Sequence, residues 1–170
     1  QAAASQLPGL EVERVRFEGN EAFPDDSLAS AIVTQETECR YWLFGPFCWA
    51  GTDFSLRRAQ LRDRELPRDQ ARLIIWYQRR GFREVQVDTP SVVREPPTAH
   101  VVFRIHEGTP VIAGSISFIG AEEFGTDGLL NELPLVAGGR LTTIALDATS
   151  DTITQRLNNR GYARAAVLRR

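Results

Sequence analysis

Several residue types that carry chemistry are scarce or missing in this chain of 170 residues. It contains no methionine, only two cysteines and only two histidines. Lysine is also absent, so the 20 residues counted as lysine or arginine are all arginine. Two cysteines without a nearby histidine cannot supply the four ligands of a tetrahedral zinc site. No apolar run approaches the roughly 20 residues that a membrane-spanning helix needs. The sequence therefore excludes a zinc site made by the two cysteines alone. It also excludes a membrane-spanning helix within these residues.

The charge is balanced, and no catalytic constellation stands out. Residues up to Glu107 carry 14 arginines and 16 acids, and the remainder carries 6 of each, so a nucleic-acid partner is not expected. His100 and His106 lie about 20 Å apart if they share one strand, too far to share a metal ion. The sequence has no Ser/His/Asp constellation and no phosphate-binding loop. We expect no catalytic residues, no metal site and no cofactor.

Two stretches of the chain repeat each other at fixed offsets. Val15 to Asn20 corresponds to Ile116 to Ala121 at an offset of 101 residues (118 − 17 for the phenylalanines). Further along, Tyr77 to Phe82 corresponds to Leu157 to Tyr162 at an offset of 80 (157 − 77). Because the two repeated motifs occur in the same order in both halves, the chain is predicted to hold two tandem copies of one small module. The difference of 21 residues (101 − 80) places an insertion in the first copy.

The first copy is predicted to begin with a strand and two helices. Val15 and Phe17 share one face of the strand. Pro24 suits the first position of the first helix, and the second helix runs from about Pro67 to Arg80, where the next residue, a glycine, suits a left-handed C-cap. Acidic residues alternate with arginines around the second helix, which predicts solvated helix faces with local ion pairs. These acidic residues are Asp63, Glu65 and Asp69.

Two further strands are expected after the second helix. Phe82 to Asp88 alternates around its valines, and Val101, Phe103 and Ile105 alternate in the next run, with both histidines on the outward face. The turn-rich residues 88–97 are predicted to join these strands as a hairpin with a long loop. The fold class is therefore α+β: two tandem β-α-α-β-β modules, each a three-stranded sheet covered by two helices.

The second copy is expected to repeat this order and to lack its last strand. Its first strand would run through residues 116–118, its helices would cover residues 129–133 and 145–160, and residues 162–168 would form the next strand. A sheet without one of its strands should be frayed. The predicted divisions are a flexible N-terminus at residues 1–9, a first module at 10–107 with an insertion at about 36–53, and a second module at 108–170.

This pattern resembles tandem POTRA (polypeptide-transport-associated) domains, the periplasmic modules of outer-membrane assembly proteins of the BamA and TamA type. The resemblance covers nearly the whole chain outside the insertion. In the first copy it is carried by Phe17, Gly19, Asn20, Phe23, Tyr77, Gly81, Phe82, Glu107 and Gly108. In the second copy it is carried by Phe118, Gly120, Phe124, Gly161 and Tyr162. Ala121 departs from the pattern, because the first copy has asparagine there.

The resemblance implies a non-enzymatic role in the periplasm. The modules would bind unfolded outer-membrane or secreted polypeptides and accessory assembly lipoproteins. They would be covalently continuous with a C-terminal membrane β-barrel after Arg170, which attaches them to the outer membrane. Two alternatives stay open: a periplasmic scaffold of the cell-division (FtsQ-like) type, and a POTRA arm fused to a lipase-like enzyme. Tandem copies argue against the first alternative, for which a single module is expected.

A small sheet has at least one edge whose backbone groups can pair with an extended client strand, the mode called β-augmentation. In the family, the strand after the second helix is usually that edge. The candidate edge residues are Phe82, Arg83, Glu84, Val85, Gln86, Val87 and Asp88. Alternatively this edge is only solvated or blunted, in which case its charged residues are protective.

The insertion contains both cysteines and a group of aromatic residues. In the oxidising periplasm that the resemblance implies, a disulfide between Cys39 and Cys48 is a simpler interpretation than two free thiols. This disulfide would contribute about 2–3 kcal/mol by the chain-entropy model. The aromatic residues are expected either to dock a partner or a membrane interface, or to pack as a satellite core on their own domain. They are Tyr41, Trp42, Phe44, Phe47 and Trp49.

Overall fold

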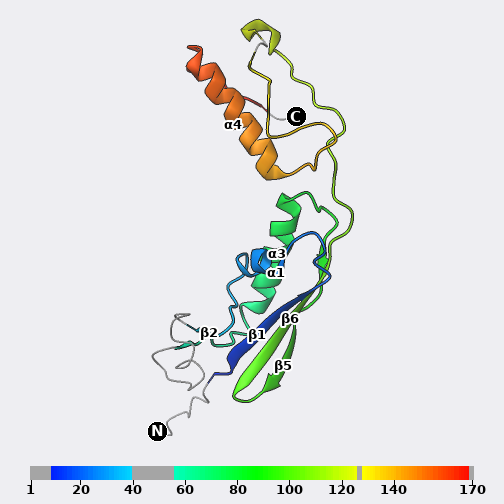
Figure 1. Cartoon of the computed structure of the whole chain (residues 1–170), viewed down its shortest axis with the longest axis vertical. Coiled ribbons are helices and arrows are strands. Elements are labelled where there is room, and N and C mark those ends of the chain that lie inside the picture. The colour runs from blue at the N-terminus through cyan, green and yellow to red at the C-terminus, as the bar shows by residue number, and fades with distance from the viewer. Residues whose placement is uncertain (1–8, 40–55, 126–127, 169–170) are drawn as a thin grey trace. The chain divides into compact units, whose positions relative to one another are not determined.

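The computed structural model describes residues 9–39, 56–125 and 128–168 (Figure 1). The chain forms two compact units. Unit 1 comprises Gln1–Trp76 and Val85–Glu107, and unit 2 comprises Tyr77–Glu84 and Gly108–Arg170. The predicted domain division at residues 107 and 108 stays a prediction. Most of the predicted flexible N-terminus lies outside the described residues.

The sheet of unit 1 is organised around one central strand, β6 (Thr98–His106). β1 (Glu11–Glu18) pairs with β6 in parallel, and β5 (Ser91–Glu95) pairs with it antiparallel. Because β1 and β5 both pair with the same part of β6, they lie on its opposite sides, as Figure 1 shows. The short β4 (Gln86–Val87) lies on the same side as β5, next to the end of β6.

A β-bulge separates β4 from β5. Val87 pairs with Ile105 and Ser91 pairs with Val102, so the outer strand advances four residues while β6 advances three. The extra residue falls at positions 89–90, where Pro90 is tolerated because an edge strand does not need every N–H group. The predicted long loop over residues 88–97 is therefore wrong. Prolines on both sides of β5 conceal a strand in this stretch, and only residues 96–97 separate β5 from β6.

One face of the sheet is buried under the helices α1 (Asp25–Ala29) and α3 (Leu66–Arg79). Alternate residues of β6, at positions 99, 101, 103 and 105, are at most 3% exposed. Leu28 of α1 and Leu73 of α3 are fully buried. The core of unit 1 therefore lies between the helices and this face of the sheet, which confirms the predicted α+β class. Among the described residues, no helix is both long and apolar enough to cross a membrane.

Unit 2 contains a long helix with its own small core. α4 (Thr143–Asn159) is capped by Thr142, whose hydroxyl accepts a hydrogen bond from the Ala145 N–H group at 2.9 Å. Residues of α4 and of the segments before and after it form the core. The buried residues are Leu129, Ile153 and Leu157, with Phe118, Phe124, Leu130, Leu133, Ala165 and Val167 packed against them.

The described part of unit 2 forms no strand, and the short helix predicted at residues 129–133 is a turn instead. A 3-10 turn occupies Glu122–Phe124. The strands predicted at residues 116–118 and 162–168 are thus wrong for this structure. The first copy supplies the physical reason, because both corresponding strands there pair with β6. The described residues of the second copy contain no counterpart of β6 for these segments to pair with.

The two copies share the geometry of their helix ends. Gly81 and Gly161 both have a φ of 95°, a left-handed conformation that glycine adopts at low cost. After each glycine, the N–H group of an aromatic residue donates to the carbonyl oxygen five residues earlier, at 3.1 Å in both copies. The motif repeated at an offset of 80 residues therefore corresponds to one repeated structural feature.

Candidate functional site

The sheet of unit 1 has two outer sides at which another strand could pair. The outer side of β1 is called the β1 edge, and the outer side of β5 is called the β5 edge. An edge is available for pairing only where its N–H and C=O groups have no partner within the protein. The described hydrogen bonds distinguish the two edges.

The first half of the β1 edge is covered by two other segments of the chain. The Val12 N–H group donates to the Ala59 carbonyl at 2.7 Å, and the Val12 carbonyl accepts from the Thr37 N–H group at 2.8 Å. The Leu61 N–H group donates to the Leu10 carbonyl at 2.7 Å. Residues 36–37 and 59–61 therefore take the place that an additional strand would need here.

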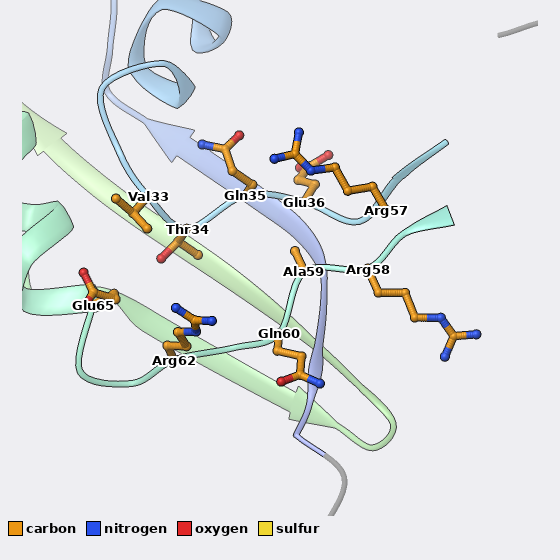
Figure 2. A pocket seen from close by; sticks show the side chains of 10 residues that line it. All are labelled: Val33, Thr34, Gln35, Glu36, Arg57, Arg58, Ala59, Gln60, Arg62 and Glu65. Carbon is orange, nitrogen blue, oxygen red and sulfur yellow. The ribbon is translucent and has the colours of Figure 1, made fainter. Parts of the chain in front are cut away.

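Further along β1, a side chain replaces the backbone as partner. The Val15 N–H group donates to Oε1 of Glu36 at 2.7 Å. Figure 2 shows Gln35 and Glu36 on one segment and Ala59 and Gln60 on the other, both beside the blue strand β1. The β1 edge is thus closed by backbone at its beginning and by one carboxylate at its middle.

A hollow of about 270 Å³ lies between these two segments (Figure 2). Its walls carry three arginines, at positions 57, 58 and 62, and two acids, Glu36 and Glu65. Both carboxylates have partners: Glu36 binds the Val15 N–H group, and Glu65 forms an ion pair with Arg68 at 2.6 Å. The lining has no serine, histidine or cysteine, and its one hydroxyl group, that of Thr34, donates to Asp69 at 2.6 Å.

A buried carboxylate holds the segment that leads to Glu36. Asp69 of α3 is fully buried, and it accepts hydrogen bonds from the N–H groups of Val33 and Thr34, both at 2.9 Å. The Thr34 hydroxyl donates to it at 2.6 Å, and Arg72 forms an ion pair with it. The solvated helix face predicted for Asp69 is therefore wrong, because the chain after α1 folds over this side chain.

The pKa of Asp69 reflects this environment. Burial raises the pKa, but the hydrogen bonds from the Thr34 hydroxyl, from the two backbone N–H groups and from Arg72 lower it by more. The pKa of Asp69 therefore lies below its ordinary value of 3.8. The carboxylate is ionised at neutral pH and acts as a fixed acceptor for the segment at residues 33–34.

The β5 edge is open in the described structure. β5 pairs with β6 and with no other described strand. The Asp88 N–H group donates to the Arg104 carbonyl at 2.9 Å, so the even-numbered residues of β6 direct their backbone groups to this side. Their partners Ser91, Val93 and Glu95 therefore point inward. By alternation, the N–H and C=O groups of Val92 and Arg94 point outward.

The residues predicted as the pairing edge are only partly in a strand. Of Phe82 to Asp88, only Gln86 and Val87 form β4, and the side chains of Phe82, Val85 and Val87 are buried. The outward carbonyl of Val87 accepts a hydrogen bond from Nε2 of Gln70 at 2.7 Å. The first strand after the second helix, β4, thus begins later than predicted. The outward backbone groups that are available for pairing lie on the next strand, β5. The role of Phe82 to Asp88 in client pairing stays a prediction.

The sequence also makes predictions for the insertion and for the two histidines. β2 (Glu38–Cys39) pairs antiparallel with β3 (Leu56–Arg57), so the two ends of the segment between them are held together. Cys48 and the five aromatic residues lie outside the described residues. The disulfide between Cys39 and Cys48 and the docking role of the aromatic residues therefore stay predictions. His100 and His106 lie on the exposed face as predicted, near Glu13 (3.9 Å) and Asp88 (3.5 Å) respectively.

Comparison with known proteins gives three findings. The POTRA family model, described as a surface antigen variable number repeat, matches residues 10–108 and again residues 111–170. A protein of Treponema pallidum (strain Nichols) named as a putative outer membrane protein assembly factor is 22% identical over 157 residues, which are 89% of this chain and 17% of that protein. The crystal structure of Haemophilus influenzae BamA POTRA3-5 gives a TM-score of 0.47 at 17% identity, covering 94% of this chain and 58% of that one.

Proposed function

The chain belongs to the POTRA family, with two copies of the domain in tandem, and from this premise we propose that it binds extended client polypeptides by β-augmentation. The proposed site is the β5 edge of unit 1. A client strand would hydrogen-bond to the outward N–H and C=O groups of Val92 and Arg94. Pairing through the backbone is largely independent of client sequence, which suits a module that receives many different polypeptides.

The observation that carries this proposal is the difference between the two edges. The β1 edge is covered by residues 36–37 and 59–61, whereas β5 has no described strand on its outer side. The bulge at residues 89–90 ends the regular pairing surface on one side, and the turn at residues 96–97 ends it on the other. The client strand would therefore pair with the five residues of β5, and residues 86–88 of the edge predicted from the sequence would border it.

The setting of this function is part of the proposal. The chain spans less than a fifth of the length of the Treponema relative that it matches, so the rest of the parent protein is inferred from that likeness. We place the modules in the periplasm, attached to the outer membrane through a downstream β-barrel. Their clients would be unfolded outer-membrane or secreted polypeptides, delivered with the help of accessory lipoproteins. The proposed role requires no cofactor and no catalytic residue.

Arg94 provides the sharpest test of the proposal. Arg94→Pro removes an outward N–H group but leaves the ladder with β6 intact, because proline is accepted on edge strands. Arg94→Ala is the matched control, since it also loses the ion pair with Asp63 (2.8 Å) but keeps the N–H group. The probe is a fluorescent peptide of about ten residues with the alternating pattern of a barrel strand.

The expected result is that Arg94→Pro weakens binding of this peptide by about tenfold, the equivalent of roughly 1.4 kcal/mol, while Arg94→Ala binds like the parent chain. Fluorescence anisotropy gives both affinities, and circular dichroism confirms that both variants are folded. Equal affinities for the proline and alanine variants would rule out pairing at the β5 edge.

A further inference from the structure

Beyond Val12, the side chain of Glu36 binds an outward-pointing group of the β1 edge. The Val15 N–H group points away from β6, since it donates to Glu36 at 2.7 Å. By the alternation of a strand, the backbone groups of Phe17 point the same way. Without Glu36, this part of β1 would present two outward-pointing residues, as many as Val92 and Arg94 present on β5. The β1 edge would then be a second pairing site of equal size.

The surface beside this part of β1 is hollowed. A hollow of about 280 Å³ is lined by Val15 and Phe17 of β1, by Asp25 and Asp26 of α1, and by residues of the segment that carries Glu36. The side chain of Glu36 reaches across the wall of this hollow to the Val15 N–H group. Among the described residues, the carboxylate is therefore the group bound to the outward Val15 N–H group, and the hollow leaves room beside it.

We infer that Glu36 closes the β1 edge to extended polypeptides and so confines client pairing to the β5 edge. This inference rests on the proposed function. A hydrogen bond from an amide to a carboxylate is stronger than one to a neutral carbonyl, so a client carbonyl does not displace Glu36 from Val15. A charged side chain directed at an edge is also one of the devices by which proteins prevent strand addition.

The position of Glu36 is fixed from both sides. On one side, Asp69 binds the N–H groups of Val33 and Thr34. On the other, the Thr37 N–H group donates to the Val12 carbonyl and the Thr37 hydroxyl accepts from the Ala59 N–H group at 3.1 Å. The carboxylate is therefore held against β1 before any client arrives, and little additional ordering is needed to keep the edge closed.

The inference is tested by site-specific photo-cross-linking to the fluorescent strand peptide. A photoreactive residue is placed at Arg16 of β1 or at Val93 of β5, both of which have exposed side chains. Each position is combined with native Glu36, with Glu36→Ala, or with Glu36→Gln. The glutamine variant is the matched control, because its amide oxygen can still accept from Val15 while the charge is removed.

With native Glu36, the peptide should cross-link from position 93 and give at least tenfold less product from position 16. Glu36→Ala should raise the yield from position 16 at least fivefold, and Glu36→Gln should give a smaller increase. Hydrogen exchange of the Val15 amide, measured without peptide, should be faster in Glu36→Ala. Glu36→Asp, whose shorter side chain retracts the carboxylate, serves as a second variant if the alanine variant is unstable.

Two negative results have different meanings. If position 93 cross-links but Glu36→Ala leaves the yield from position 16 unchanged, Glu36 does not close the β1 edge and the proposed function stands. The same conclusion follows if position 16 already cross-links as well as position 93 with native Glu36. If neither position cross-links in any variant, the proposed function itself is wrong.

Discussion

Asp69 holds Thr34 by two hydrogen bonds, one from the backbone N–H group at 2.9 Å and one from the hydroxyl at 2.6 Å. The two residues lie 35 positions apart in the chain, and both are buried. Their contact fixes the segment between α1 and the insertion against α3. That segment supplies Glu36 and Thr37, which cover the β1 edge, so a contact inside the core determines which edge of the sheet is exposed.

Removal of the Asp69 side chain should strongly destabilise unit 1. Asp69→Ala leaves the buried Thr34 N–H and hydroxyl groups and the partly buried Val33 N–H group without an acceptor, and we expect a loss of about 3 kcal/mol in the free energy of unfolding. Urea denaturation measures this loss. Asp63→Ala is the control, because it removes an exposed carboxylate with a single ion pair to Arg94, and should cost about 0.5 kcal/mol or less. Similar losses for both variants would contradict the buried role of Asp69.

Asp69 should also contribute to the loss of stability in acid. Its pKa is lower in the folded state than its ordinary value of 3.8, so its contribution is complete above pH 3.8 and is lost as the pH falls through the folded-state pKa. The melting temperature of the parent chain should therefore fall below this pH. In Asp69→Asn, which has no proton to gain, the fall should be smaller. Parallel pH profiles for the two proteins would contradict the assignment.

Gln70 should stabilise the strand that follows α3. Its side-chain amide donates to the Val87 carbonyl across 17 residues of sequence, and Gln70→Glu replaces this donor with a charged acceptor. We expect a loss of about 1–2 kcal/mol in the free energy of unfolding. Gln78→Glu makes the same substitution at an exposed position of α3 and should have little effect. A comparable loss in both variants would show that helix charge, rather than the Val87 contact, is responsible.

The predicted disulfide between Cys39 and Cys48 is open to a direct test. Thiol titration under denaturing conditions should find no reactive cysteine before reduction and both cysteines after it. Reduction should then lower the free energy of unfolding by about 2–3 kcal/mol. The double variant Cys39→Ser, Cys48→Ser should be insensitive to reductant. Two reactive thiols in the unreduced chain would remove the disulfide from consideration.

The elements that the sequence predicts well are those determined by local residues. α3 has a clear helical pattern and ends at Arg79, two residues before the positive φ of Gly81, and the observed helix differs from the predicted one by one residue at each end. The doubled motifs indicate the tandem family correctly, and at the helix ends Gly81 and Gly161 have the same φ and the aromatic residue after each makes the same hydrogen bond. Local sequence is sufficient in these cases.

Features that depend on distant residues could not be predicted in the same way. Glu36 contacts Val15 across 21 residues, and nothing near Glu36 indicates that β1 is its neighbour. Asp69 lies among arginines in the sequence, so its burial by residues 33–34 has no local signal. β5 is flanked by prolines that suggest a loop, and only its pairing with β6 makes it a strand.

The central position of β6 has a consequence for the order of folding. β1, β4 and β5 each hydrogen-bond to β6 and to no other strand of that sheet, and β6 is the last of the four in the chain. A polypeptide that emerges amino-terminus first cannot form any of these ladders until its residues 98–106 have appeared. Formation of this sheet therefore depends on the last of its four strands to be synthesised.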